Sequence, residues 1–265
     1  DDPLSSIAIA RAHTELRASE ARARILDGAQ WVSQAADVYL GQISDALGQA
    51  LLTSLQALEP GYQTEGMREV FATEVRSARD AVLSAANARC GDRYLFAGYQ
   101  DRKVPFLEGP GGVVDYVGDG KQLVVPIGEG RTCPISVPGD LLMNMGGTHV
   151  PGASRDVFTV LTDLARAIQT GDHATVRQRR AELMVLHEHV VQLRGYVGAS
   201  QMRLRANREA LDDTQMRCTE ILNQEESVDL AEVISQYATQ ETVYKSVLHV
   251  YSRILSLPTV FDLAR

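Results

Sequence analysis

The sequence is poor in the residues that disulfide scaffolds, metal sites and membrane spans require. Its 265 residues include three cysteines, Cys90, Cys133 and Cys218, which are scattered and not in C-x-x-C spacing. This pattern argues against a disulfide framework and a zinc site and predicts three small, partly buried thiols. No window reaches the roughly 18 consecutive apolar residues of a membrane span, and the first residues show no signal-peptide pattern. We therefore predict no membrane contact.

Positive charge is also scarce. The chain has 26 Lys and Arg against 34 Asp and Glu, for a formal net charge of -8 and a pI near 5.3. Such a chain has no overall attraction to phosphate backbones, so we predict no nucleic-acid partner. The sequence begins with Asp1 rather than Met, which predicts that it derives from a longer chain.

Catalytic motifs are missing as well. The six histidines are dispersed, and His187 and His189 are two residues apart, which places them on different helix faces and favours solvated positions over metal ligation. The glycine-rich stretches 109–112 and 118–120 lack the spacing of phosphate-binding loops and favour hairpin turns. With neither Gly-x-Ser-x-Gly nor H-E-x-x-H present, we predict no catalytic residue, no metal, no cofactor and no enzyme.

Two charged stretches have ordinary interpretations. Residues 225–229 (Glu-Glu-Ser-Val-Asp) lack the glycine of a calcium loop and precede an apolar helix, so a helix start or a solvated joint is favoured. Residues 177–180 (Arg-Gln-Arg-Arg) favour a hydrophilic helix face, with contact to acidic neighbouring subunits as the alternative.

Glycine and proline divide the chain into three parts. Residues 98–152 hold 12 of the 21 glycines and 6 of the 9 prolines, and short β-prone runs there predict an inserted antiparallel β domain. Residues 1–97 and 153–265 show helical spacing, with a stop at Pro60-Gly61 and another near Gly91. The sequence therefore predicts a mainly α fold, a long antiparallel helical bundle with a small β insert.

The C-terminal part contains a heptad pattern. Seven residues follow one another at intervals of seven, which predicts a coiled-coil-like intramolecular seam. These seam residues are Val176, Leu183, Val190, Val197, Leu204, Leu211 and Cys218.

The last helical stretch is apolar around most of its circumference. Such a helix must be buried on nearly all sides, and the given sequence offers too little surface to cover it. We predict an assembly interface, covered by a preceding N-terminal segment, by neighbouring subunits, or by both. Its residues are Leu230, Val233, Ile234, Tyr237, Tyr244, Leu248, Tyr251 and Leu255.

Four segments resemble one known family. They are residues 1–6 (Asp-Asp-Pro-Leu-Ser-Ser), Asn87 with 91–98 (Gly-Asp-Arg-Tyr-Leu-Phe-Ala-Gly), 116–119 (Tyr-Val-Gly-Asp), and 225–232 leading to Ser-Leu at 256–257 and Phe-Asp-Leu at 261–263. Their order and placement are similar to the flagellin family and, within it, to the branch of hook-filament junction proteins. The resemblance covers nearly the whole chain.

The resemblance implies a structural role. Residues 1–97 and 153–265 would form the two halves of a flagellin-like rod domain, with a terminal assembly helix at the C-terminal end and an outward-facing insert. The protein would be exported to the bacterial flagellum without a cleaved signal peptide, and would join the hook to the filament. Implied partners are the preceding hook-associated protein, flagellin, further copies of itself in a ring or helical layer, and an export chaperone.

Two alternatives stay open at this point. The chain could be a filament-forming flagellin, in which the same surfaces self-polymerise. An enzyme or metal protein within the β insert would instead require bound metal or a deep pocket lined by Asp115, Tyr116 and Asp119.

Overall fold

The chain forms two compact units. The computed structural model describes the backbone of residues 3–62, 64–128, 130–145 and 150–255, and the side chains of these ranges except 3–5, 62, 226–232 and 254–255. Unit 1 comprises residues 1–22 and 211–265, and unit 2 comprises residues 23–210. The two long helices α1 (Pro3–Gln56) and α5 (His173–Leu255) each contribute to both units.

The N-terminal helices end where the sequence predicts, with one exception. Helix α1 stops before the short 3-10 helix η1 (Pro60–Tyr62), and α2 (Glu65–Ala86) begins at Thr64, whose side chain accepts a hydrogen bond from the Met67 backbone nitrogen at 3.4 Å. The second stop, predicted in the region of residues 87–91, falls at its first residue and not at the glycine. Helix α2 ends at Asn87. The side-chain nitrogen of Asn87 donates a hydrogen bond to the Phe106 backbone oxygen at 2.9 Å, and its side-chain oxygen accepts one from the Phe106 backbone nitrogen at 3.0 Å. The insert is therefore attached directly at the helix end.

The described residues form three separate two-stranded antiparallel sheets, of which β1–β2 precedes the insert and the other two lie within it. Because β3 pairs with β4 and β5 with β6, residues 118–120 connect two hairpins and do not form the predicted hairpin turn. The predicted turn at 109–112 does join the strands of one hairpin, as the 3-10 helix η2 (Pro110–Gly112). The strands are β1 (Arg89–Cys90), β2 (Arg93–Tyr94), β3 (Phe106–Glu108), β4 (Val114–Tyr116), β5 (Val124–Gly128) and β6 (Arg131–Pro134), and they are followed by helix α3 (Gly139–Met143).

An aromatic cluster joins the insert to the helices. The Phe106 ring lies 5.1 Å from the Tyr116 ring and 5.8 Å from that of Phe158, which belongs to α4 (Val157–Thr170). Gly139 passes so close that a Cβ there would lie 2.6 Å from both Phe106 Cζ and Tyr116 Cε2. The insert thus has no core of its own and shares that of the helices, as expected for a segment of about 50 residues.

Side-chain caps fix the starts of α4 and α5. Asp156 accepts a hydrogen bond from the Thr159 backbone nitrogen at 2.9 Å, and Gly171 ends α4 in the left-handed conformation at φ 72°. Asp172 then accepts hydrogen bonds from the hydroxyl and backbone nitrogen of Thr175, which lower the pKa of its carboxyl group. Helix α5 continues without interruption through residues 225–229, so the prediction of a helix start there was wrong.

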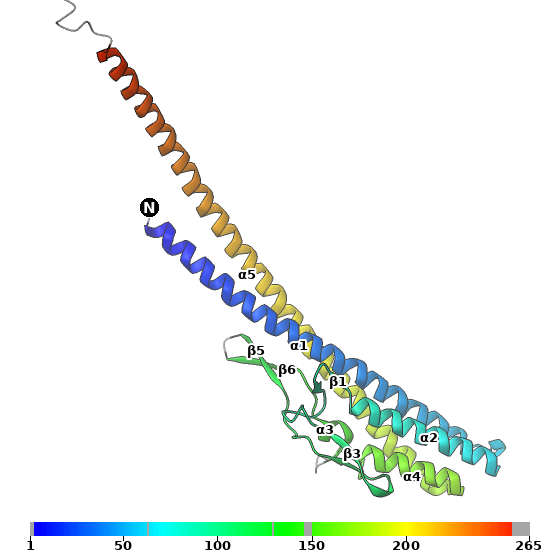
Figure 1. The fold of residues 1–265 in the computed structure, drawn as a ribbon. Coiled ribbons are helices and arrows are strands. Elements are labelled where there is room, and N and C mark those ends of the chain that lie inside the picture. The colour runs from blue at the N-terminus through cyan, green and yellow to red at the C-terminus, as the bar shows by residue number, and fades with distance from the viewer. Residues whose placement is uncertain (1–2, 63, 129, 146–149, 256–265) are drawn as a thin grey trace, which may run out of the picture. The chain divides into compact units, whose positions relative to one another are not determined.

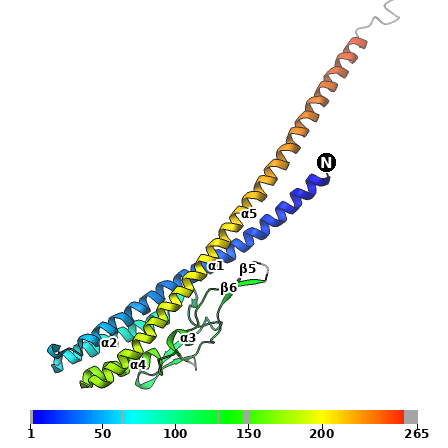
Figure 2. The same ribbon diagram turned by 180° about the vertical axis from the view of Figure 1, so that it is seen from behind.

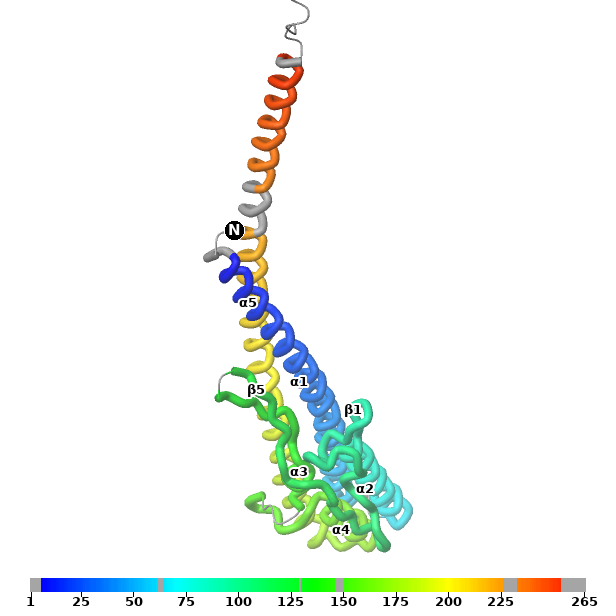
Figure 3. Tube along the Cα trace, turned by 60° about the vertical axis from the view of Figure 1, so that its left-hand side comes forward, coloured from blue at the N-terminus to red at the C-terminus, as the bar shows by residue number. Residues whose placement is uncertain are grey.

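Within unit 2, α1 and α5 run antiparallel. Three contacts define the register of the two helices. Asp27 Oδ1 lies 2.9 Å from Arg208 Nε, and Asp37 Oδ1 lies 3.2 Å from Arg194 Nε. Ser44 Oγ lies 3.1 Å from His187 Nε2. Helices α2 and α4 lie beside the α1–α5 pair, and the strands and α3 lie along the same stretch (Figures 1 and 2). Figure 3 shows the insert from another side. The predicted fold, a mainly α antiparallel bundle with a small β insert, is confirmed.

Candidate assembly surface

The candidate site is the exposed surface of a helix. In unit 1, residues 233–251 of α5 present large apolar side chains to solvent, and we call this set the apolar tail surface. Six predicted interface residues are at least half exposed: Val233 (60%), Ile234 (60%), Tyr237 (70%), Tyr244 (65%), Leu248 (50%) and Tyr251 (62%). The side chains of the other two, Leu230 and Leu255, lie outside the described residues.

Three valines widen this surface. Val243, Val247 and Val250 are 57–59% exposed, and together with Tyr251 they line a shallow groove of about 390 Å³. The groove also includes Thr242 and Ser246, whose hydroxyl groups donate to backbone carbonyls one turn earlier at 2.8 Å. Because these hydroxyls are occupied within the helix, the groove presents mainly methyl and aromatic groups.

Charge contributes little to the apolar tail surface. Lys245 Nζ lies 2.7 Å from Glu241 Oε1 on the same helix, so these two charges largely neutralise one another. The groups that this surface presents to solvent are therefore mainly apolar. An exposed apolar area of this extent is typical of a protein–protein interface.

The heptad residues are enclosed where the structure describes them. In unit 2, Val176, Leu183, Val190, Val197 and Leu204 are at most 2% exposed. In unit 1, Cys218 is 4% exposed, and Leu211 is half-buried with its backbone oxygen accepting a hydrogen bond from Ser19 Oγ at 3.3 Å. Their assignment as one continuous seam remains a prediction.

The prediction of solvated histidines was wrong, and the prediction of a hydrophilic face over 177–180 holds for Arg177 and Gln178, which are exposed, but not for Arg179. His187 and His189 are half-buried, and their Nε2 atoms lie 3.1 Å from Ser44 Oγ and 2.9 Å from the Leu141 backbone oxygen. They do point in different directions, as their spacing predicted. Arg179 is buried and forms an ion pair with buried Glu182 at 2.7 Å. Sequence periodicity does not reveal these contacts, because the partner or the covering segment is distant in sequence.

The polar residues of the insert have structural partners. The Tyr116 hydroxyl donates to the Phe96 backbone oxygen at 3.0 Å and accepts from the Gly139 backbone nitrogen at 3.3 Å. Burial, with smaller effects of the nearby Asp140 and Asp119 carboxylates, raises the pKa of Tyr116 to about 12, against the lowering effect of the Gly139 hydrogen bond. Asp119 Oδ1 accepts a hydrogen bond from the Tyr99 backbone nitrogen at 2.6 Å.

The thiols and acidic groups are likewise dispersed. Cys133 and Cys218 are buried and Cys90 is half-buried; all three are free, and burial raises the pKa of the Cys90 thiol. Over the described residues, no group of three or more His, Cys, Asp or Glu side chains is placed to hold a metal ion. No helix in the described part of the chain combines the length and apolarity needed to cross a membrane.

Unit 2 is thus a helical bundle that carries an insert, and unit 1 presents an exposed apolar helix surface of the kind found in protein–protein interfaces. No family model matches the sequence. Two curated proteins match it. Flagellar hook-associated protein 3 of Escherichia coli is 22% identical over 243 residues, which cover 85% of this chain and 75% of that protein. Flagellar hook-associated protein 3 of Salmonella typhimurium is 28% identical over 117 residues, which cover 42% of this chain and 36% of that protein. The sequence resemblance to the junction branch of the flagellin family is confirmed.

Solved structures share the fold. A flagellar hook-associated protein from Vibrio parahaemolyticus superposes with a TM-score of 0.75 at 18% identity, covering 84% of this chain and 98% of that one. The flagellar junction protein FlgL of Legionella pneumophila gives a TM-score of 0.66 at 13% identity, covering 83% and 100%. The Bacillus cereus FlgL structure gives 0.63 at 18% identity, covering 80% and 97%.

Proposed function

We propose that this chain is a structural protein of the bacterial flagellum, a junction adaptor that joins the hook to the flagellin filament. The observation that carries the proposal is the apolar tail surface, because an exposed apolar area of this extent is typical of a protein–protein interface. The sequence match to hook-associated protein 3 and the shared fold support the junction role over the alternatives of a filament-forming flagellin or a small enzyme. We accordingly expect no catalytic turnover.

The apolar tail surface supplies a physical mechanism for joining. Burying a Val, Leu or aromatic side chain that is otherwise exposed contributes about 1.5 to 3 kcal/mol, and the apolar tail surface holds nine such residues between Val233 and Tyr251. A contact between this helix and a different surface of the next subunit is heterologous, so it propagates along a helical layer instead of closing into a dimer. Such contacts allow one subunit to match two unlike neighbours.

The same proposal names the partners. They are the preceding hook-associated protein, flagellin and further copies of this chain in a ring or helical layer, with an export chaperone covering the apolar tail surface before assembly. We place the protein outside the cell, on the flagellum, after export without a cleaved signal peptide. The relatives that carry hook-associated names support the flagellar assignment, and these individual partners are part of the proposal.

Electron microscopy of a strain that lacks the full-length gene tests the junction role. We expect hooks without filaments and flagellin shed into the medium, with both defects restored by the gene. Intact filaments in the deletion strain would contradict the proposal. Seeded polymerisation of the full-length protein into long filaments would favour the flagellin alternative instead.

Point variants test the surface itself. Tyr244→Asp places a charge on the apolar tail surface, whereas Ser235→Asp, nine residues earlier and on the opposite side of the helix, is a matched control. We expect Tyr244→Asp to abolish filament attachment and Ser235→Asp to preserve it, with equal helix content by circular dichroism. Equal attachment in both variants would show that the apolar tail surface does not carry assembly.

A further inference from the structure

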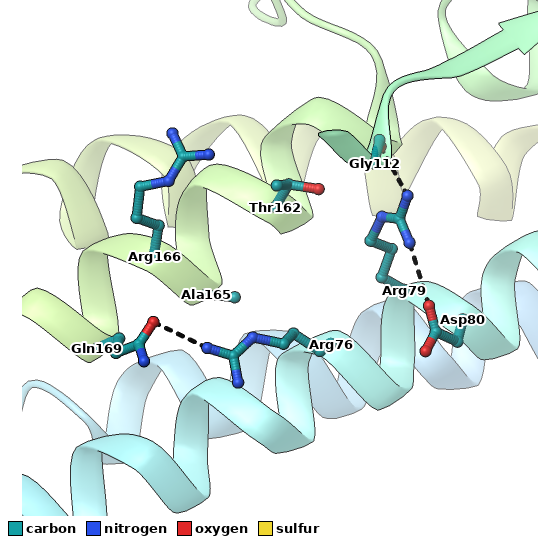
Figure 4. Close-up of a pocket in the computed structure, with 8 residues that line it drawn as sticks. All are labelled: Arg76, Arg79, Asp80, Gly112, Thr162, Ala165, Arg166 and Gln169. Carbon is teal, nitrogen blue, oxygen red and sulfur yellow. Dashed lines mark hydrogen bonds and ion pairs between the residues drawn. The ribbon is translucent and has the colours of Figure 1, made fainter. Parts of the chain in front are cut away.

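A second surface feature lies in unit 2, in the space between α2 and α4. A cleft of about 390 Å³ opens there, and Figure 4 shows that its arginines belong to both helices, with Arg79 and Arg166 well apart along it. Arg76 and Arg79 come from α2 and Arg166 from α4, while Ala165 is small and leaves the space between them open. The lining residues are Arg76, Arg79, Asp80, Gly112, Thr162, Ala165, Arg166 and Gln169.

Arg79 is the buried donor of this cleft. Its side chain is only 9% exposed, with Nη2 at 2.7 Å from both Glu108 Oε1 and the Gly112 backbone oxygen, and Nη1 at 3.1 Å from Asp80 Oδ1. Its Nε is buried with no hydrogen-bond partner among the described residues. In Figure 4 this nitrogen lies on the side of the guanidinium that faces the cleft. A buried N–H without an acceptor is unfavourable, and an acceptor seated in the cleft would relieve it.

Arg166 supplies the accessible charge. Its side chain is 70% exposed, and the carboxylate beside it, Asp163, lies 3.7 Å from Nη1, longer than a hydrogen bond. That carboxylate also forms a closer ion pair with Arg155. Arg76, by contrast, is engaged by Glu69 Oε1 at 3.1 Å and Gln169 Oε1 at 2.8 Å. Arg166 can therefore accept a new anionic partner without breaking a short contact.

The lining offers many donors and few acceptors. Asp80 is the single carboxylate among the lining residues, and it already pairs with Arg79. The Thr162 hydroxyl donates its proton to the Phe158 backbone oxygen at 2.8 Å. A ligand that presents only acceptors suits this set, and a carboxylate matches the geometry of a guanidinium group particularly well.

We propose that the cleft binds the carboxylate of an acidic side chain presented by a partner protein, with Arg166 as its exposed donor and Arg79 Nε as its buried donor. A protein side chain fits better than a free ion for two reasons. The volume exceeds that of a small oxyanion several-fold, and the aliphatic stems of the arginines with Ala165 can cover the methylenes of a glutamate. Identifying the partner as a neighbouring flagellar subunit rests on the function proposed above, whereas the carboxylate chemistry does not.

The test is a titration of the whole chain with two blocked tripeptides, acetyl-Ala-Glu-Ala-amide and its glutamine counterpart. Arginine Nε–H resonances are followed by NMR, because a new acceptor at Arg79 shifts its signal. We expect the glutamate peptide to shift the Arg79 and Arg166 signals. Arg166→Ala should weaken the binding by roughly two- to fivefold, because an ion pair of an exposed side chain contributes up to about 1 kcal/mol. Arg166→Lys should weaken it less.

Controls make the result decisive. Arg205→Ala removes the same charge from an exposed position on another helix and should leave the titration unchanged. The proposal is overturned if the glutamine peptide produces equal shifts, if Arg205→Ala weakens binding as much as Arg166→Ala, or if inorganic phosphate binds at these arginines and the glutamate peptide does not. None of these readouts depends on filament attachment, so a failure here is distinguishable from a failure of the junction role.

Discussion

Two regions of the same helix use apolar residues in opposite ways. Between Val176 and Leu204, one stripe of α5 is buried within unit 2, and the remaining faces carry polar residues with scattered Val and Met. Between Val233 and Tyr251, the apolar residues surround most of the helix and are all at least half exposed. The first pattern stabilises the chain's own fold, because it is satisfied within the molecule. The second stays exposed among the described residues, and we propose that it serves assembly.

The largest effect is expected when a side chain in the buried region is shortened. Leu204 is fully buried, so Leu204→Ala should lower the free energy of unfolding by about 2 to 5 kcal/mol. Met202, two residues away and 66% exposed, provides the control: Met202→Ala should change it by less than about 0.5 kcal/mol. Urea unfolding of both variants checks this, and equal losses would show that burial does not separate the two positions.

Two glycine substitutions, one in the insert and one in α5, compare an enclosed position with an open one. Gly139→Ala places a methyl group against Phe106, Tyr116 and the Phe96 backbone oxygen, and should destabilise the protein by about 1 to 3 kcal/mol. Gly195 lies in α5 with nothing within 4 Å of its Cβ position, so Gly195→Ala should stabilise by up to about 1 kcal/mol. Thermal unfolding distinguishes the two signs, and a stabilising Gly139→Ala would contradict the packing described.

A smaller effect is expected from Tyr116→Phe, which removes two hydrogen bonds and should cost on the order of 1 kcal/mol near neutral pH. The pH dependence has a definite sign. The pKa of Tyr116 is raised from its ordinary value of 10 to about 12 in the folded chain. The neutral hydroxyl group therefore contributes fully to the free energy of unfolding below pH 10, and this contribution is lost as the pH rises towards 12. Urea midpoints between pH 9 and 12 should therefore fall more steeply in the parent than in Tyr116→Phe, and parallel curves would count against this linkage.

The smallest effect on folding is expected at the apolar tail surface. Leu248→Ala and Tyr251→Ala should change the unfolding free energy of the isolated chain by no more than about 0.5 kcal/mol, since both side chains are at least half exposed. The same variants should impair filament attachment in cells. Losses of several kcal/mol in the isolated chain would mean that these residues already have partners within it.

Much of the fold was predictable from local patterns. Pro60-Gly61 ended α1, the glycine-rich residues 98–152 formed the insert, and the 3.6-residue spacing identified the long helices. Interruptions were predicted less well. The glycine at position 91 predicts a helix stop, but Asn87 caps α2. The position of the helix end depends on a hydrogen bond from Asn87 to Phe106, 19 residues away. The acidic residues 225–229 did not interrupt α5, since nothing in them prevents helical hydrogen bonding.

For the candidate surfaces, the sequence alone determined which helix is apolar around most of its circumference and which apolar positions repeat every seven residues. Both patterns depend only on the order of the residues along a helix. The tertiary structure decided what covers each face. It buried Arg179 against Glu182, turned His187 and His189 to different neighbours, and brought Arg79 and Arg166 to opposite walls of one cleft, 87 positions apart in the chain. Arg179 and Glu182 are three residues apart on one helix, so packing decided only their burial. The other juxtapositions depend on how separate elements pack, and no local spacing contains that information.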